Sequence, residues 1–193
     1  MYKNTPQRLI YFLLLFFMLS ACNVDRKSDY KNSNSEWKSL FDGSSLDGWH
    51  QLGSDAQYYV ENDMIVVTAK TGYANSLLTT HEKYGDFILE LDVKVDPGLN
   101  SGVLFRSHSR DGDEHVYGYQ LEIDSSSRRW SGGIYGEGGR GWLYSLSRNS
   151  QARSAFSLST WNHMRIEVIG TSIRSWVNTP RGRVGRKARR SGI

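Results

Sequence analysis

Polar side chains that could transfer a proton lie on one side of a predicted strand near the middle of the chain. Residues 117–124 read Tyr-Gly-Tyr-Gln-Leu-Glu-Ile-Asp, and the two-residue repeat of a strand places Gln120, Glu122 and Asp124 on the same face. Carboxylates two residues apart on a strand have α-carbons about 6.5 Å apart, which suits a general acid and a general base. Glu122 and Asp124 are therefore predicted catalytic residues, and an ordinary solvated sheet face is the alternative.

A cation is expected close to these carboxylates. Side chains of a strand alternate between its two faces, and Arg106 is an odd number of positions from Val103 and Phe105. Its side chain should therefore point away from the face on which those two apolar residues lie. We predict that Arg106 is a catalytic residue that holds an oxyanion or a substrate carboxylate. An ion pair with Glu122 or Asp124 on a neighbouring strand is equally consistent with its position and would keep the carboxylate ionised.

Aromatic and amide side chains near these strands are candidate ligand contacts. The aromatic residues lie in or beside turns, where rings contact ligands, although burial in the core is their commoner role. Two amides lie on or shortly before the predicted strands and could donate hydrogen bonds to a substrate. The predicted substrate-binding residues are Asn100, Gln120, Tyr135, Trp49 and Trp130, with Trp142 as a further aromatic residue of the same kind.

The elements that must position these residues are short strands separated by turns. Residues 86–95 alternate between apolar and polar side chains, which predicts a half-buried strand. No stretch after the first 22 residues has a useful helical repeat. The pattern predicts one all-β domain over residues 37–178, an antiparallel β-sandwich of jelly-roll type. Further strands are expected at residues 57–61, 64–68, 77–80, 103–106, 117–124, 163–169 and 173–177.

Residues 1–21 are predicted to form a lipoprotein signal peptide. Lys3 and Arg8 precede an apolar run from Leu9 to Leu19, which is too short for a transmembrane helix to be the better interpretation. The run ends at Leu-Ser-Ala-Cys, which is typical of a lipobox, so we expect lipidation of Cys22. Residues 22–36 are polar and are predicted to be a flexible tether. The alternative is an ordinary signal peptide with an incidental cysteine.

The charge of the chain is concentrated at its ends. The net charge is +4, but residues 179–193 carry six positive charges and residues 1–21 carry two, which leaves −4 for the rest of the chain. A protein domain of this charge lacks the basic face that nucleic-acid binding requires, and we expect no nucleic-acid partner. Cys22 is the only cysteine, which excludes an intramolecular disulfide.

No metal or organic cofactor is expected. The five histidines have no spacing typical of a zinc site, and the chain has no nucleophile elbow, phosphate loop or dinucleotide motif. Residues 111–114, Asp-Gly-Asp-Glu, make a divalent cation the alternative, but they lack the length and terminal carboxylate of an EF-hand loop.

Six motifs follow one another along the chain: Trp37–Trp49, Tyr84–Leu89, Asn100–Arg106, Tyr119–Asp124, Gly133–Gly136 and Trp161-Asn162. Together they resemble the 3-keto-disaccharide hydrolase domain family, and the likeness spans Trp37 to about Asn178, nearly the whole predicted domain. The resemblance implies a concanavalin-like β-sandwich, often on an exported bacterial lipoprotein, that acts on glycosides oxidised at carbon 3. Residues 179–193 depart from the family pattern, and we expect a truncated or frameshifted end, or a disordered tail, and a sandwich that lacks an inner strand.

The family implies cleavage of a 3-keto-glycoside or disaccharide, by one of two routes. One is acid/base hydrolysis by Glu122 and Asp124; the other is elimination after a base removes the proton on carbon 2, followed by addition of water, with Arg106 on the enolate oxygen. The expected partners are a carbohydrate substrate and a membrane, reached through the lipid anchor in the cell envelope. The alternatives are a non-catalytic carbohydrate-binding lipoprotein and an inactive truncated copy.

Overall fold

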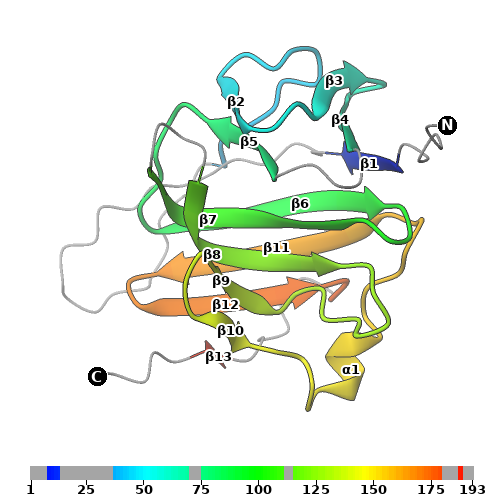
Figure 1. Ribbon diagram of the computed structural model, residues 1–193, viewed down its shortest axis with the longest axis vertical. Coiled ribbons are helices and arrows are strands. Elements are labelled where there is room, and N and C mark those ends of the chain that lie inside the picture. Colours follow the sequence, from blue (N-terminus) through cyan, green and yellow to red (C-terminus); the bar gives the residue numbers. More distant parts are fainter. Residues whose placement is uncertain (1–7, 14–36, 70–74, 111–114, 180–186, 189–193) are drawn as a thin grey trace, which may run out of the picture.

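The computed structural model describes residues 8–13, 37–69, 75–110, 115–179 and 187–188, and this part of the chain is nearly all β (Figure 1). Its helix is the single turn α1 (Ser150–Arg153). The strands are β1 (Arg8–Leu13), β2 (Trp49–Gly53), β3 (Gln57–Glu61), β4 (Met64–Ala69), β5 (Ser76–Thr80), β6 (Phe87–Val95), β7 (Asn100–Arg110), β8 (His115–Asp124), β9 (Ile134–Glu137), β10 (Gly141–Tyr144), β11 (Asn162–Ile169), β12 (Ser172–Val177) and β13 (Lys187–Ala188).

The strands form two main sheets and a small third one. The larger sheet has the order β13-β12-β11-β6-β1-β4-β3, the second has the order β10-β9-β8-β7, and β2 pairs with β5. Every ladder is antiparallel. The predicted all-β, antiparallel β-sandwich of concanavalin or jelly-roll type is confirmed.

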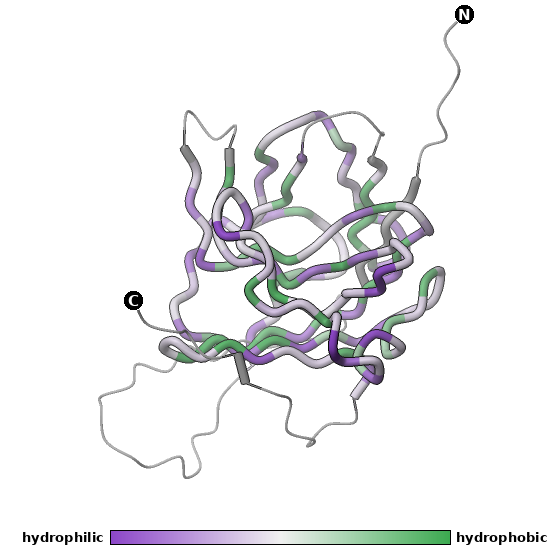
Figure 2. The backbone as a smooth tube through the Cα atoms, turned by 60° about the horizontal axis from the view of Figure 1, so that its bottom comes forward, coloured by the Kyte–Doolittle hydropathy of each residue, from purple (hydrophilic) through white to green (hydrophobic). Residues whose placement is uncertain are grey.

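The core lies where β6 and β11 of the larger sheet face β8 of the second sheet. On β6 and β11 the side chains alternate, and Val93, Met164 and Ile166 are 0% exposed. Leu121 and Ile123 of β8 are also 0% exposed and belong to the same apolar cluster. Figure 2 shows the corresponding alternation of hydrophobic and hydrophilic positions along the strands. The inward residues of β8 therefore hold the two sheets together.

The predicted strand over residues 86–95 and the hairpin over residues 57–68 are both confirmed. Strand β6 begins at Phe87 and ends at Val95, and β3 and β4 are joined by Asn62 and Asp63. These two turn residues have φ values of 51° and 58°, the left-handed conformation that a two-residue hairpin turn requires. The turn sets the register that places Tyr58 opposite Val67.

The N-terminal segment contains a strand within the residues of the predicted signal peptide. Arg8–Leu13, expected within a signal peptide, forms strand β1 between β4 and β6. Residues 14–36, which include Cys22 and the predicted tether, lie outside the described residues, as do 180–186 and 189–193 of the basic tail. Within the described residues, no helix is long and apolar enough to cross a membrane.

The core between the sheets can be tested on β11. Ile166 is 0% exposed, so Ile166→Ala should leave a cavity and lower the free energy of unfolding by about 2–5 kcal/mol. Ile169 on the same strand is 47% exposed, and Ile169→Ala should change the free energy by less than about 0.5 kcal/mol. Urea unfolding of the two variants measures both changes. Equal losses of unfolding free energy in the two variants would contradict the placement of Ile166 in the core.

Candidate active site

The polar face of β8 is buried. Gln120, Glu122 and Asp124 are 9%, 3% and 4% exposed, although their neighbours Leu121 and Ile123 occupy the apolar core on the opposite face. The solvated sheet face that the sequence left as an alternative is therefore wrong. Buried carboxylates need hydrogen-bond donors, so the groups around Glu122 and Asp124 define what each can do.

Two amides hold the carboxylate of Glu122. Asn100 at the start of β7 donates from Nδ2 to Oε1 at 3.2 Å, and Gln120 on β8 donates from Nε2 to Oε2 at 3.0 Å. Gly102, opposite Glu122 in the ladder, makes room for this arrangement. A Cβ atom there would lie 2.6 Å from Cγ of Gln120, so a side chain at this position would displace the amide.

The surroundings of Glu122 raise its pKa. Burial is the largest cause, and the negative charge of Asp124 acts in the same direction. The hydrogen bonds from Gln120 and Asn100 and the positive charge of Arg128 oppose the shift without cancelling it. A carboxylate with a raised pKa is a stronger base when ionised, and two neutral donors orient it without the full stabilisation that an ion pair would give.

Asp124 has a different environment, because its side chain organises the loop that follows β8. Its Oδ1 accepts the backbone N–H of Ser126 at 2.9 Å, and its Oδ2 accepts Nε of Arg128 and the backbone N–H of Trp130, both at 3.2 Å. Its backbone N–H donates to Oγ of Ser131 at 2.9 Å. Both carboxylate oxygens are thus engaged by donors from one short loop.

These donors lower the pKa of Asp124. Burial by itself raises the pKa, but the hydrogen bonds from Ser126, Trp130 and Arg128 outweigh burial and favour the charged form. Glu122 and Asp124 therefore have pKa values shifted in opposite directions. Such a difference separates the roles of two neighbouring carboxyl groups, with Glu122 suited to proton transfer and Asp124 to holding a loop.

The loop places an aromatic cluster beside the buried carboxylates. Trp130 and Trp142 meet edge to face with ring centres 4.7 Å apart, and Tyr135 meets Trp142 at 5.2 Å. Cζ of Arg128 lies 5.3 Å from the ring centre of Trp130 and 5.4 Å from that of Trp142. The side chain of Arg128 is 45% exposed, so a cation is held at the surface of the cluster.

Strand pairing explains why the cluster and Glu122 share a face. Tyr135 on β9 lies opposite Gln120 on β8, and Trp142 on β10 lies opposite Tyr135. Directly opposite residues of an antiparallel pair project to the same side of the sheet. Five of the predicted site residues are brought together on this face of the second sheet: Asn100, Gln120, Glu122, Asp124 and Tyr135, with Trp130 joining them from the loop.

Arg106 does not join this group. Its Nη2 pairs with Oδ1 of Asp86 at 2.7 Å, and its Nη1 donates to the carbonyl oxygen of Gly170 at 2.5 Å. The predicted ion pair with Glu122 or Asp124 is wrong. The cause is an irregularity between Phe105 and His108, where the β7–β8 register shifts, and the φ of Arg106 is 47°. A bulge of this kind changes the direction of a side chain relative to simple alternation.

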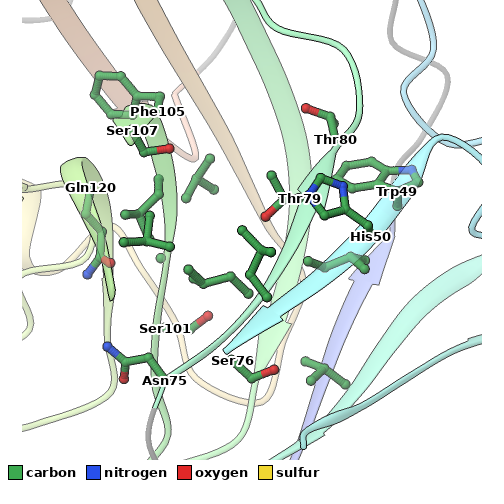
Figure 3. Close-up of a pocket in the computed structure, with 18 of the residues that line it drawn as sticks. Trp49, His50, Asn75, Ser76, Thr79, Thr80, Ser101, Phe105, Ser107 and Gln120 are labelled. Atoms are coloured by element: carbon green, nitrogen blue, oxygen red, sulfur yellow. The ribbon is translucent and has the colours of Figure 1, made fainter. Parts of the chain in front are cut away.

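Trp49 lies across a cavity from Gln120 (Figure 3). The cavity has a volume of about 1310 Å³ and is bordered by β2, β5 and β7. Figure 3 shows Gln120 on one side and Trp49 and His50 on the other. Nε1 of Trp49 donates to the carbonyl oxygen of Leu40 at 2.9 Å, which ties the loop before β2 to the strand. Trp49 is thus a wall of the cavity, and not a member of the aromatic cluster.

Arg128 was missed by the sequence analysis. It lies in a run of serines and arginines after β8, where the sequence has no repeat that could indicate the direction of a side chain. Its position four residues after Asp124 is the one available signal, because a turn can bring those two residues together. Among the described residues, no group of three or more His, Cys, Asp or Glu side chains could hold a metal ion.

Fold and site together define a β-sandwich protein with a buried, amide-held carboxylate beside an aromatic cluster. Residues 36–180 match the family model of the 3-keto-disaccharide hydrolases, described as the 3-keto-alpha-glucoside-1,2-lyase-like domain. The chain belongs to this family, as its motifs predicted. Membership indicates a glycoside-related function.

The comparison with solved structures agrees on the fold. One similar structure is that of a "putative glycosyl hydrolase" from Parabacteroides distasonis ATCC 8503, with a TM-score of 0.51 and 18% sequence identity over 78% of this chain and 69% of that chain. At this identity the likeness shows the fold alone. None of the curated proteins compared with the chain matches it.

The role of Asp124 in holding its loop predicts a pH-dependent loss of stability. Asp124→Asn replaces one acceptor oxygen with a donor that faces N–H groups, so the free energy of unfolding should fall by about 1–3 kcal/mol at neutral pH. The folded-state pKa of Asp124 is lowered, so its contribution is present above its ordinary pKa and is lost as the pH falls through the folded value. Urea unfolding followed by tryptophan fluorescence at several pH values measures the difference.

Asp47 provides the matched control, because it is an exposed aspartate. Asp47→Asn should leave stability and the pH profile unchanged within about 0.5 kcal/mol. A constant deficit of Asp124→Asn at all pH values would contradict the proposed origin of the effect.

Proposed function

We propose that the chain is a glycoside-cleaving enzyme that acts on 3-keto-glycosides, with Glu122 as the general base. The environment of Glu122 carries this proposal. The residue is 3% exposed, two amides orient its carboxylate, and its pKa is raised. The family supports the substrate class.

The chemistry follows from the ketone on carbon 3, which acidifies the hydrogen on carbon 2. Glu122 takes this proton, and the electron pair of the C–H bond forms an enolate with its charge on the carbon-3 oxygen. The enolate then restores the ketone, a double bond forms between carbons 1 and 2, and the aglycone leaves carbon 1 with the proton returned by Glu122. Water adds across the double bond and gives the free 3-keto sugar.

Elimination is favoured over hydrolysis by two carboxylates because of the state of Asp124. Hydrolysis needs a second carboxyl group that donates a proton or attacks the sugar. Both oxygens of Asp124 accept hydrogen bonds from its own loop, and its pKa is lowered. An acidic group held in this way is a poor proton donor, so the proposal gives it a positioning role.

Arg128 is the cation best placed to stabilise the enolate oxygen. Its positive charge acts on Glu122, because it opposes the rise in the pKa of that carboxyl group that burial causes. Its side chain is partly exposed at the aromatic cluster. Arg106, predicted for this role from the sequence, is held by Asp86 and Gly170 instead. Developing negative charge is stabilised most by a positive group that is already in place.

The aromatic cluster is the proposed binding platform for the sugar. Tyr135 and Trp142 lie on the same face as Gln120, and Trp130 packs against Trp142. Aromatic rings offer an apolar surface with polar edges, which suits a sugar ring of mixed character. Asn100 and Gln120, predicted as substrate contacts, are assigned to positioning the base. Lipidation at Cys22, attachment to a membrane and a location in the cell envelope stay predictions from the sequence.

The first test removes the base. Glu122→Gln keeps the size and hydrogen-bonding capacity of the side chain but cannot accept the proton, so kcat on a 3-keto-glucoside should fall by about 10²–10⁴-fold. In the unchanged protein, activity should rise with pH through the raised pKa of Glu122, above its ordinary value of 4.5. Release of a chromogenic aglycone measures both effects.

Glu61→Gln is the control, because Glu61 is exposed in the β3–β4 hairpin and should retain full activity. Deuterium at carbon 2 of the substrate should slow the reaction by a large primary isotope effect if elimination occurs, whereas hydrolysis, which leaves that C–H bond intact, would show only a small secondary effect. Full activity of Glu122→Gln would overturn the assignment of the base. Tight binding of unoxidised glycan without turnover would favour the non-catalytic binding module.

The second test removes part of the platform. Trp142 meets both Trp130 and Tyr135, so Trp142→Ala should raise KM by about tenfold, the equivalent of about 1.4 kcal/mol of lost aromatic contact, with a smaller change in kcat. Trp161 is 41% exposed, and Trp161→Ala is the control that should leave KM unchanged. An unchanged KM in Trp142→Ala would exclude the cluster as the binding surface.

A further inference from the structure

Strand β1 occupies an interior position in the larger sheet. It pairs antiparallel with β4 on one side and with β6 on the other, and the order of the sheet is β13-β12-β11-β6-β1-β4-β3. Its ladder with β4 runs over six residue pairs, from Arg8 opposite Ala69 to Leu13 opposite Met64. Strand β1 therefore joins the hairpin of β3 and β4 to β6 and the strands beyond it.

The register places the centre of β1 beside buried residues of its neighbours. Ile10 lies opposite Val67 and Val95, and Phe12 lies opposite Ile65 and Val93. In the presence of β1, these four partners are between 0% and 5% exposed. The position between β4 and β6 is thus part of the interior of the sheet, and not an edge.

An unoccupied position would leave a gap in this sheet. Two neighbours of a missing strand lie about 9.6 Å apart, twice the usual spacing, which is too far for direct hydrogen bonds. In the described residues the hairpin of β3 and β4 is joined to the rest of the larger sheet only through β1. Without β1, the inner sides of β4 and β6 would both present unpaired backbone groups, which bind an added strand readily.

We propose that the position between β4 and β6 is a strand-binding site, and that its occupant is the extended apolar segment Arg8–Leu13 of this chain. The segment matches the six-residue length of β4, and its central residues Ile10, Tyr11 and Phe12 are of types that favour strands. The site takes this sequence in the intact chain, and it takes the same sequence as a separate peptide when the chain's own copy is prevented from pairing.

This site competes with the predicted signal peptide for the same residues. Cleavage before Cys22 removes Arg8–Leu13 from the chain, so a processed form has an open position between β4 and β6. The binding site belongs to the larger sheet, whereas Glu122 and the aromatic cluster belong to the second sheet. Failure of the strand-binding proposal therefore leaves the proposed function unaffected.

The first experiment traps the register by a disulfide in the full chain. With Cys22→Ser as background, Leu9→Cys and Thr68→Cys place two thiols on directly opposite residues, at a separation that a disulfide can span. Mild oxidation should remove both free thiols and give an intramolecular bond. The control pair Leu9→Cys and Met64→Cys should keep its thiols, because Met64 lies opposite Leu13. Equal oxidation of the two pairs, or none in either, would overturn the proposal.

The second experiment opens the site and refills it. Ile10→Pro in the full chain introduces a residue that cannot donate to a ladder. Those amides of Met64–Ala69 and Asp92–Val95 that face β1 should therefore exchange with solvent at least about tenfold faster. Asn4→Pro, outside the strand, is the control. A synthetic peptide of residues 3–13 should restore slow exchange to the Ile10→Pro protein, and the reversed sequence should not. Unchanged exchange in Ile10→Pro, or equal rescue by both peptides, would overturn the proposal.

Discussion

The burial of the Glu122 carboxylate is the constraint on which the candidate site depends. A charged group removed from water is costly unless donors compensate it, and here the donors are two neutral amides from the same sheet. Gly102 is part of this requirement, because a side chain at its position would displace Gln120. The result is a carboxylate that is oriented, yet more basic than an exposed one.

Strand β8 links this site to the stability of the fold. Leu121 and Ile123 join the two main sheets, and the alternating residues Gln120, Glu122 and Asp124 face the other way. Pairing with β7 and β9 places partners on both sides of the strand. Apolar packing on one face therefore makes the polar face rigid, which is what precise proton transfer needs.

The loop after β8 gives the second carboxylate a separate task. Asp124 gathers N–H donors from Ser126, Arg128 and Trp130, and in doing so it positions a cation and an aromatic ring next to Glu122. Two similar side chains on one strand face thus differ in chemistry, because Glu122 is held by two amides of the sheet and Asp124 by its own loop.

Period-two alternation and turn residues are local signals, so the fold class, most of the strands, the family and the shared face of Gln120, Glu122 and Asp124 could be predicted from the sequence. The partners that the site residues contact could not be predicted in this way, because they depend on how distant segments pack together. A bulge after Phe105 turned Arg106 to Asp86, an irregular loop brought Arg128 to Asp124, and an apolar segment typical of a leader, Arg8–Leu13, became an interior strand. Apolar character specifies burial, but the surface that provides it is set by pairing between strands far apart in the chain.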